Sequence, residues 1–247
     1  MEKHSDEFKE HLWNNHGYFL NCMMHNMAKF QTPSLYCAMN ELSNHDHSRF
    51  LTRTNQQAGR VQVLGAKAAE EGINKAVFAE AVVMQMFWPG APTLYYGDEA
   101  GVCGFTDPDN RRTYPWGRED HELIAFHKEI IKIHKQYSVF KTGSVLRLGA
   151  DYQFLAYARF NKKDCMVVVI NNRSGEISKE LSVWEAGIKD GMYLERIFLS
   201  YEDGFTMKPH WYEVKGGMAQ IQLSSHSALI LRAVSEKGSK EDINEQA

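Results

Sequence analysis

Apolar residues recur every three or four positions over three segments in the first half of the chain. This spacing predicts amphipathic helices over residues 5–30, 66–88 and 121–137. Ser5 is the predicted N-cap of the first helix, and Pro33 marks the break after it. Short apolar runs at residues 35–39 and 93–96 lie between the helices and predict buried strands. Alternating helices and single strands indicate an α/β fold with a parallel sheet.

After Phe140 the period of the pattern changes from helical to β. Short β-branched or alternating runs, each bounded by turn residues, predict strands at residues 145–148, 154–159, 166–170, 192–198, 218–223 and 228–231. Such a series indicates an antiparallel β-sandwich that follows the α/β half. The boundary between the two halves is predicted near residues 137–143. Residues 235–247 are charged and contain few apolar side chains, which predicts a disordered tail.

The composition is that of an ordinary globular protein. Of its 247 residues, 43% are hydrophobic and 24% are charged, which is enough for the core of one large or two small domains. The net charge of −3 offers no attraction to nucleic-acid phosphates or to anionic membranes. No apolar run approaches the roughly 20 residues that a membrane-spanning helix needs.

Cysteine usage and the polar start of the chain bear on its compartment. The first residues, MEKHSDEFKEHLW, contain no apolar core of a secretory signal. The four cysteines are Cys22, Cys37, Cys103 and Cys165. They are widely separated and form no C-x-x-C pair, which predicts buried, reduced thiols and neither disulfides nor a zinc site. We therefore expect a cytoplasmic protein.

Two polar segments follow the predicted strands and are rich in carboxylates, histidines and arginines. Asn44-His45-Asp46-His47-Ser48-Arg49 comes after the first strand. Tyr95-Tyr96-Gly97-Asp98-Glu99 ends the second strand, and Asp107-Pro108-Asp109-Asn110-Arg111-Arg112 follows in the next loop. Barrel enzymes keep their catalytic carboxylates and arginines at the C-terminal ends of strands. The two segments are therefore the candidate functional site.

These segments resemble the last two strand-end motifs of the α-amylase superfamily, glycoside hydrolase family 13, in the form typical of cyclomaltodextrinase, neopullulanase and maltogenic amylase. The resemblance spans about residues 8–234 and is strongest between residues 44 and 116. It implies that residues 1–140 form the last strands and helices of a (β/α)8 TIM barrel, and that residues 141–234 form a β-sandwich C-terminal domain. The chain departs from the common Thr/Ser-Pro-Arg after the first motif, where it reads His47-Ser48-Arg49.

The resemblance also implies roles for individual residues. Retaining glycosidases use a carboxylate nucleophile and a carboxylic acid on either side of the scissile bond, and contacts to the sugar 2-hydroxyl strengthen in the transition state. Asp46 matches a third carboxylate that stabilises the transition state, with His45 beside it. Asp107 and Arg111 match residues that bind the neighbouring sugar, and Arg49 is a further expected substrate contact. No cofactor or metal is implied for these residues, although calcium can bind elsewhere in such enzymes.

The nucleophile motif Gly-x-Arg-x-Asp and the acid of the fifth barrel strand are absent from the sequence. We therefore expect the C-terminal portion of an α-glucan hydrolase that is inactive by itself. Its expected substrates are malto-oligosaccharides, cyclodextrins or pullulan, cleaved at α-1,4 or α-1,6 bonds. The expected partner is an α-glucan oligosaccharide and neither nucleic acid nor membrane, and the complete enzyme can form a homodimer.

Two other functions fit the same residues. One is a carbohydrate-binding or interaction module derived from such an enzyme, and the other is a glucosyltransferase or isomerase of the same superfamily.

Local alternatives also remain open. His45 and His47 alternate along an extended chain and can form part of a metal site. Arg111 can simply pair with Asp107 to order its loop. Trp116 is a candidate for stacking against a sugar.

Overall fold

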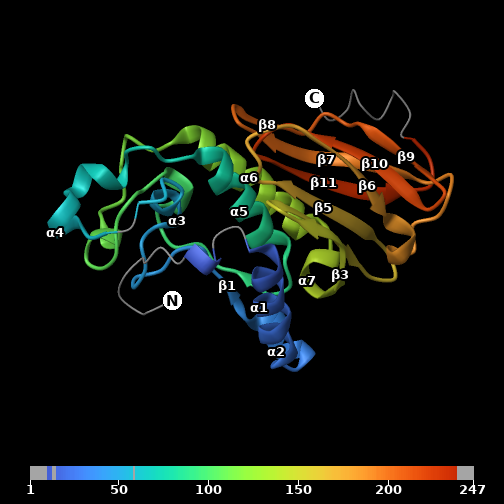
Figure 1. Cartoon of the computed structure of the whole chain (residues 1–247), viewed down its shortest axis with the longest axis horizontal. Helices are drawn as coiled ribbons and strands as arrows, with labels where there is room; N and C mark the ends of the chain where they lie inside the picture. Colours follow the sequence, from blue (N-terminus) through green and yellow to red (C-terminus); the bar gives the residue numbers. More distant parts are fainter. Residues whose placement is uncertain (1–9, 13–14, 58, 238–247) are drawn as a thin grey trace. The chain divides into compact units, whose positions relative to one another are not determined.

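The computed structural model describes residues 10–12, 15–57 and 59–237. The chain falls into two compact units, residues 1–136 and 137–247, which Figure 1 colours along the sequence. The predicted cap Ser5 and residues 238–247 of the predicted tail lie outside the described residues. The predicted domain limits of 1–140, 141–234 and 235–247 stay predictions.

The first unit consists of helices and one small parallel sheet. Its α-helices are α1 (His16–Ala28), α2 (Thr32–Cys37), α3 (Phe50–Arg53), α4 (Val61–Leu64), α5 (Lys75–Phe87) and α6 (His121–Gln136). Short 3-10 turns are η1 (Glu10–Leu12), η2 (Ala66–Ala69), η3 (Asp98–Ala100) and η4 (Asp109–Arg111). Strands β1 (Met39–Asn40) and β2 (Ala91–Pro92) pair in parallel. Because parallel strands need a crossover connection, α5 lies between them in the sequence.

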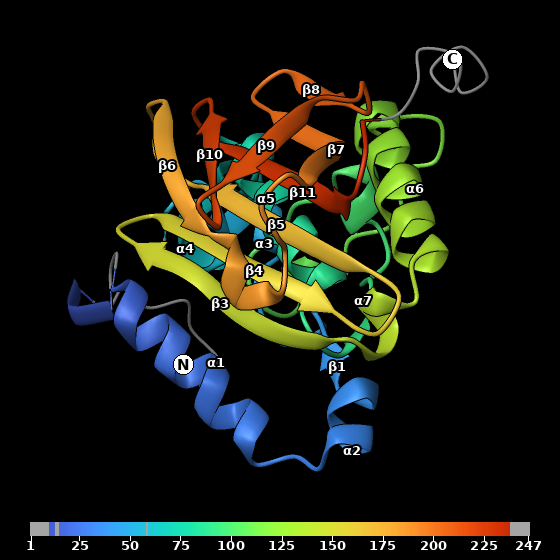
Figure 2. The same cartoon turned by 90° about the vertical axis from the view of Figure 1, so that its right-hand side faces the viewer.

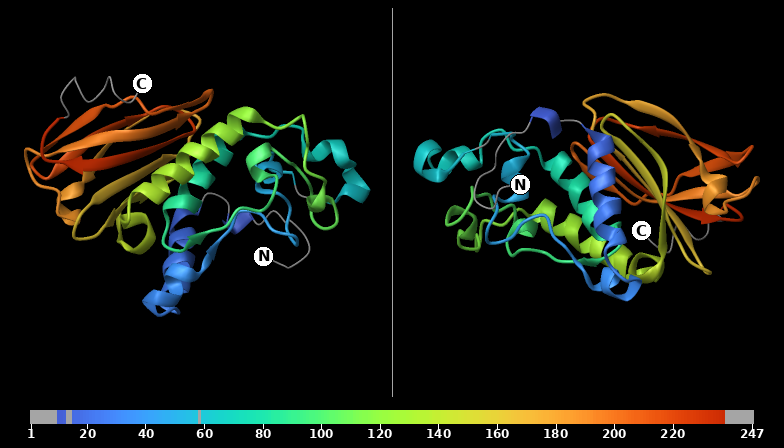
Figure 3. Two further views of the ribbon diagram at one scale, coloured as in Figure 1. Left: turned by 180° about the vertical axis from the view of Figure 1, so that it is seen from behind. Right: turned by 60° about the horizontal axis from the view of Figure 1, so that its bottom comes forward.

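Helices α5 and α6 form the centre of the first unit, where they lie side by side (Figure 3). Asn74 caps the start of helix α5, since its side chain accepts a hydrogen bond from the N–H of Val77 at 3.0 Å. Most of the side chains of α5 are buried, so it is an interior helix. Helix α6 buries one stripe of apolar residues, Leu123, Phe126, Ile130 and Ile133, as the spacing predicts. The predicted helix at 121–137 is confirmed to within one residue.

The two predicted strands of this unit need correction. The prediction of a strand at residues 35–39 is wrong, because α2 occupies most of it and only Met39 belongs to β1. Pro33 lies in the first turn of α2, where its missing N–H costs no hydrogen bond. It therefore favours the start of this helix, in addition to ending the segment before it. The second strand, β2, lies just before the predicted run at residues 93–96.

The predicted helix at residues 66–88 is two pieces, η2 and α5. Gly72 separates them with a φ of +69°, a left-handed conformation that glycine adopts at little cost. Asn74 then caps α5. The uniform apolar spacing hides this break, which depends on the backbone of one glycine.

The second unit is built from antiparallel strands, seen in Figure 2. The strands are β3 (Ser144–Asp151), β4 (Phe154–Phe160), β5 (Cys165–Asn171), β6 (Ile177–Ser182), β7 (Tyr193–Tyr201), β8 (Gly204–Thr206), β9 (Trp211–Lys215), β10 (Met218–Leu223) and β11 (Ser227–Val234). A short helix, α7 (Val139–Thr142), precedes them, and a 3-10 turn, η5 (Val183–Ala186), follows β6. All six predicted strands are present, which confirms a β-rich second half.

The strands form one connected sheet in the order β3-β4-β5-β11-β7-β9-β10-β6, with β8 beside β7. Strand β9 pairs with both β7 and β10, so the two layers of the predicted sandwich are continuous through it. Alternate side chains of the layers meet in one core, which includes Val167, Leu181, Ile221 and Leu229. Strands β6, β8 and β9 were not predicted, because β6 and β8 contain few apolar residues and β9 is short.

Two further sequence predictions can be compared with the structure. All four cysteines are free thiols, but only Cys103 is buried, and the prediction of burial is wrong for the exposed Cys37. Within the described ranges, no helix has the length and apolar character needed to cross a membrane.

Candidate functional site

The first candidate loop follows β1 and is shaped by Asn44. The side-chain oxygen of Asn44 accepts hydrogen bonds from the backbone N–H groups of Asp46 at 2.9 Å and His47 at 3.1 Å. Asparagine commonly turns the backbone in this way. The side chains of His45 and Asp46 are 64% and 54% exposed, and His45 Nε2 lies 3.5 Å from Asp46 Oδ1. Both side chains are therefore open to a ligand.

The second candidate loop follows β2 and contains Asp107 and Arg111. Their side chains are about half exposed, and Arg111 Nε lies 2.5 Å from Asp107 Oδ1. The ion pair considered as an alternative for Arg111 is thus present. Because the pair is exposed, its contribution to stability is small. Because about half of each side chain is exposed, the pair can still bind a hydroxyl.

Arg112 anchors this second loop. Its guanidinium donates two hydrogen bonds to the carboxylate of Asp109, at 3.0 and 2.9 Å, and one to Glu70 at 2.7 Å. The hydroxyl of Tyr96 donates to the carbonyl oxygen of Arg112 at 2.8 Å. Such a forked arginine–carboxylate pair has a fixed geometry. Arg112, the residue that follows Arg111, therefore holds the second loop in a fixed position.

Arg49 joins the two loops. Its side chain is fully buried, with Nε donating to the carbonyl oxygen of Asn110 at 2.9 Å and Nη1 to Asp98 Oδ1 at 2.9 Å. Its guanidinium carbon lies 4.2 Å from the ring centroid of Tyr95 and 4.8 Å from that of Tyr96, which are cation–π distances. The backbone N–H of Arg49 also donates to the carbonyl of Gly104.

The position of Arg49 departs from the prediction that it contacts substrate. Its guanidinium is enclosed by protein and has no surface open to a sugar. The geometry makes it a positioning residue, since each of its contacts ties the loop after β1 to the loop after β2. Gly104 allows the loop after β2 to fold closely on itself, because a Cβ atom there would lie 2.5 Å from the carbonyl oxygen of Asp109.

Asn110 reinforces the connection from the other side. This side chain is fully buried and donates to the carbonyl oxygens of Asn44 at 3.0 Å and His47 at 2.8 Å. It therefore grips the first loop on either side of His45 and Asp46. Asn110 and Asn44 were not predicted as site residues. Their signal in the sequence is weak, because asparagine in a polar loop is common.

Asp98 supplies the buried negative charge that Arg49 needs. Burial raises the pKa of the Asp98 carboxyl above its ordinary value, while hydrogen bonds from Ser43 and Arg49 and the charge of Arg49 oppose that rise without cancelling it. The role of Asp98 is therefore to hold Arg49 in place. Its neighbour Glu99 accepts a hydrogen bond from the N–H of Gly97.

The residues that the structure describes contain no group of three or more His, Cys, Asp or Glu side chains arranged to hold a metal ion. His45 and His47 thus have no third ligand among these residues.

The sequence of this chain is similar to those of known proteins. The family model for the α-amylase catalytic domain matches residues 4–207. An amylopullulanase of Thermoanaerobacter thermohydrosulfuricus is 32% identical over 222 residues, covering 82% of this chain and 14% of that protein. A cyclomaltodextrinase of Thermoanaerobacter pseudethanolicus is 33% identical over 195 residues, covering 78% of this chain and 28% of its own length. Neopullulanase 2 of Thermoactinomyces vulgaris is 35% identical over 154 residues, covering 61% of this chain and 23% of its own. The chain thus spans less than a third of these relatives.

Solved structures show the same fold. An α-amylase from Anoxybacillus superposes with a TM-score of 0.71 at 24% identity, covering 96% of this chain and 44% of that one. An α-amylase from Geobacillus thermoleovorans, complexed with acarbose, gives a TM-score of 0.70 at 20% identity, covering 91% and 44% of the two chains.

Proposed function

This chain belongs to the α-amylase family, and on that premise we propose that it supplies sugar-binding strand ends of an α-glucan hydrolase. The observation that supports the proposal best is the direct contact between two polar loops that follow neighbouring parallel strands. In the proposed enzyme, β1 and β2 are adjacent strands of a (β/α)8 barrel, and the β-rich unit is its C-terminal domain. Ligand sites of such barrels lie at the C-terminal ends of the strands.

In this proposal Asp46 stabilises the transition state. Its exposed carboxylate accepts hydrogen bonds from hydroxyls of the sugar that is cleaved, and the exposed His45 beside it provides a further hydrogen-bonding group. As positive charge develops on the sugar ring, its hydroxyls become better donors and these bonds strengthen. A contact that strengthens in this way lowers the barrel enzyme's activation energy as well as binding the substrate.

Asp107 and Arg111 bind the neighbouring sugar. Their ion pair leaves the Arg111 fork partly free, so the same guanidinium can hold the carboxylate and a sugar hydroxyl. A contact one sugar away from the scissile bond acts equally on bound substrate and transition state. We therefore expect it to govern KM more than kcat.

The nucleophile and the general acid come from polypeptide that this sequence does not contain. The sequence has no Gly-x-Arg-x-Asp motif, and retaining hydrolysis needs a carboxylate that forms the covalent intermediate. The proposed substrates are α-glucans with α-1,4 or α-1,6 bonds, such as malto-oligosaccharides, cyclodextrins and pullulan.

A chimeric enzyme tests this function. The matching segment of the cyclomaltodextrinase from T. pseudethanolicus is replaced by this chain, and hydrolysis of β-cyclodextrin is measured as release of reducing sugar. We expect activity well above that of the same cyclomaltodextrinase cut off before the segment. A chimera that folds, as judged by circular dichroism, and yet has no more activity than the truncated control would overturn the proposal.

A further inference from the structure

An exposed aromatic pair lies in the loop between the second candidate site and α6. The side chain of Trp116 is 81% exposed, and its ring centroid lies 4.5 Å from that of Tyr114 with an angle of 49° between the planes. A single exposed apolar side chain is ordinary. Because the two planes are tilted, the pair is not one flat surface, but the exposed ring of Trp116 is by itself a flat apolar face that a ligand with a matching face can pack against.

The backbone around this pair is held in place. The N–H of Trp116 donates to the carbonyl of Tyr114 at 2.9 Å, and the N–H of Arg118 donates to that of Pro115 at 2.8 Å. Backbone N–H groups, including that of Gly117, donate to the carboxylate of Glu119 and lower its pKa. Because these hydrogen bonds hold the backbone that carries the pair, a ligand loses little binding energy to ordering this loop.

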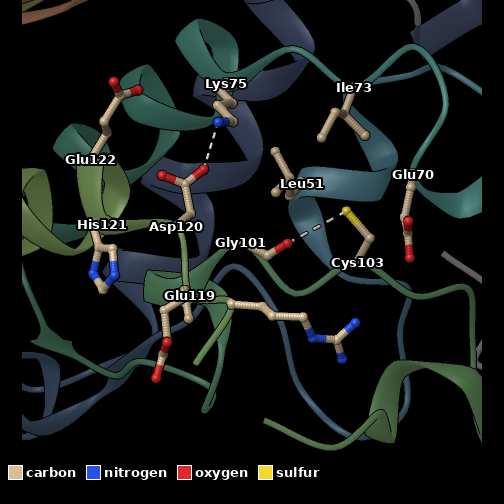
Figure 4. A pocket seen from close by; sticks show the side chains of 12 residues that line it. Leu51, Glu70, Ile73, Lys75, Gly101, Cys103, Glu119, Asp120, His121 and Glu122 are labelled. Atoms are coloured by element: carbon tan, nitrogen blue, oxygen red, sulfur yellow. Dashed lines mark hydrogen bonds and ion pairs between the residues drawn. The ribbon is translucent and has the colours of Figure 1, made fainter. Parts of the chain in front are cut away.

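A pocket of about 530 Å³ adjoins this loop and shares Arg118 and Glu119 with it (Figure 4). Its volume lies in the usual range for small-molecule sites. The apolar part of its lining includes Leu51, Ile73 and Cys103. Burial raises the pKa of the Cys103 thiol, so this thiol stays neutral and this part of the lining remains apolar at physiological pH.

The polar part of the lining, called the pocket rim below, is mixed in charge. It carries the cations Lys75 and Arg118 and the carboxylates Glu70, Glu119, Asp120 and Glu122. Lys75 Nζ lies 2.5 Å from Asp120 Oδ2, so part of this charge is already paired. The excess of carboxylates disfavours a phosphate or another anion, and the two cations disfavour a metal ion. Dense donors and acceptors that begin two residues along the chain from Trp116 suit a neutral ring with many hydroxyls.

We infer that the Tyr114–Trp116 pair and this pocket form a second binding site for an α-glucan chain. One glucose ring packs its C–H face on Trp116, and hydroxyls of the next sugars bond to the pocket rim at Arg118 and Glu119. The choice of α-glucan over other polyols rests on the proposed function, but the site itself is complete in this chain. This second site binds a long glucan in addition to the contacts that Asp107 and Arg111 make.

The test measures binding of maltoheptaose to the full chain by isothermal titration calorimetry. We compare the wild type with Trp116→Ala, and with Trp184→Ala as the matched control, because Trp184 is a 61% exposed tryptophan of the second unit. We expect Trp116→Ala to raise Kd about tenfold, and Trp184→Ala to leave it unchanged. Maltoheptaose should also protect the wild-type tryptophan fluorescence from acrylamide quenching, and this protection should vanish in Trp116→Ala.

A third variant, Arg111→Ala, separates this inference from the proposed function. Wild-type affinity in Trp116→Ala together with weaker binding in Arg111→Ala would overturn the second site and leave the proposed function standing. Absence of any maltoheptaose binding by the wild-type chain would also overturn the second site, and the chimera would then decide the proposed function by itself. An equal loss in Trp116→Ala and Trp184→Ala would show a nonspecific effect of removing tryptophan, and would equally overturn it.

Discussion

Replacing Arg49 by methionine should destabilise the first unit strongly. Methionine keeps much of the volume of the buried stem but removes the hydrogen bonds to Asn110 and Asp98, and leaves the carboxylate of Asp98 buried at 5% side-chain exposure without its cation. Removing one partner of a buried ion pair typically costs about 3–5 kcal/mol. For a chain of this size, that loss corresponds to a fall in Tm on the order of 10 °C.

Three further variants isolate the cause of this loss. Asp98→Asn in the Arg49→Met background removes the stranded charge, so the double variant should recover about 1–3 kcal/mol of the loss. Arg49→Lys keeps the charge but not the planar fork, and should fall between wild type and Arg49→Met. Arg111→Met is the matched control, because it breaks an exposed pair and should cost less than about 1 kcal/mol.

The loss should also depend on pH. Burial already raises the pKa of Asp98, and without Arg49 it rises further above the ordinary carboxyl value of 3.8. The folded variant then binds a proton in a range where the unfolded chain does not. The penalty of Arg49→Met is therefore fully present above the raised pKa, and it shrinks as pH falls toward the ordinary value.

The measurement is urea unfolding of all four variants and the wild type, followed by circular dichroism at neutral pH and at about pH 5. A loss below about 1 kcal/mol in Arg49→Met, equal to that in Arg111→Met, would refute the view that Arg49 and Asp98 form a buried, interdependent pair.

The remaining predictions concern the helix cap, the loop and the isolated chain. Asn74→Ala removes the side-chain acceptor for the N–H of Val77 and should cost about 1 kcal/mol in urea unfolding; an unchanged midpoint would contradict the cap. In the chimera, Arg111→Ala should raise KM for cyclodextrin and spare kcat, and should leave hydrolysis of a short aryl glucoside unchanged; equal losses on both substrates would place Arg111 in the support of the loop. The isolated chain should release no reducing sugar from starch, pullulan or cyclodextrin. Release that increases with protein concentration would refute the proposal that the chain lacks the nucleophile.

The sequence predicts the elements whose evidence lies in their own periodicity. Helix α6 shows this, because its buried stripe at Leu123, Phe126, Ile130 and Ile133 is visible in the sequence and correct in the structure. Elements that depend on one backbone position are missed. The break at Gly72 and the start of α2, with Pro33 in its first turn, are set by local φ preferences, which a pattern of apolar residues does not contain.

The candidate site was predicted as two loops from their motifs, but not how the loops are joined. Asp46 and Arg111 are exposed, as binding residues need to be, whereas Arg49 is buried and acts between the loops. In the sequence, a charged residue that binds a ligand cannot be told from one that is buried between two loops. Only the tertiary contacts with Asp98 and Asn110 distinguish the two.

The most direct test of the proposed function is kcat for cyclodextrin hydrolysis by the chimera with Asp46→Asn. The substitution keeps the shape of an exposed side chain and removes its charge, so the free energy of unfolding should stay within about 0.5 kcal/mol of the parent chimera. Loss of a contact made mainly in the transition state should lower kcat about 10²–10³-fold. A kcat within a fewfold of the parent, at unchanged stability, would contradict the assignment of Asp46 and with it the proposed role of this chain.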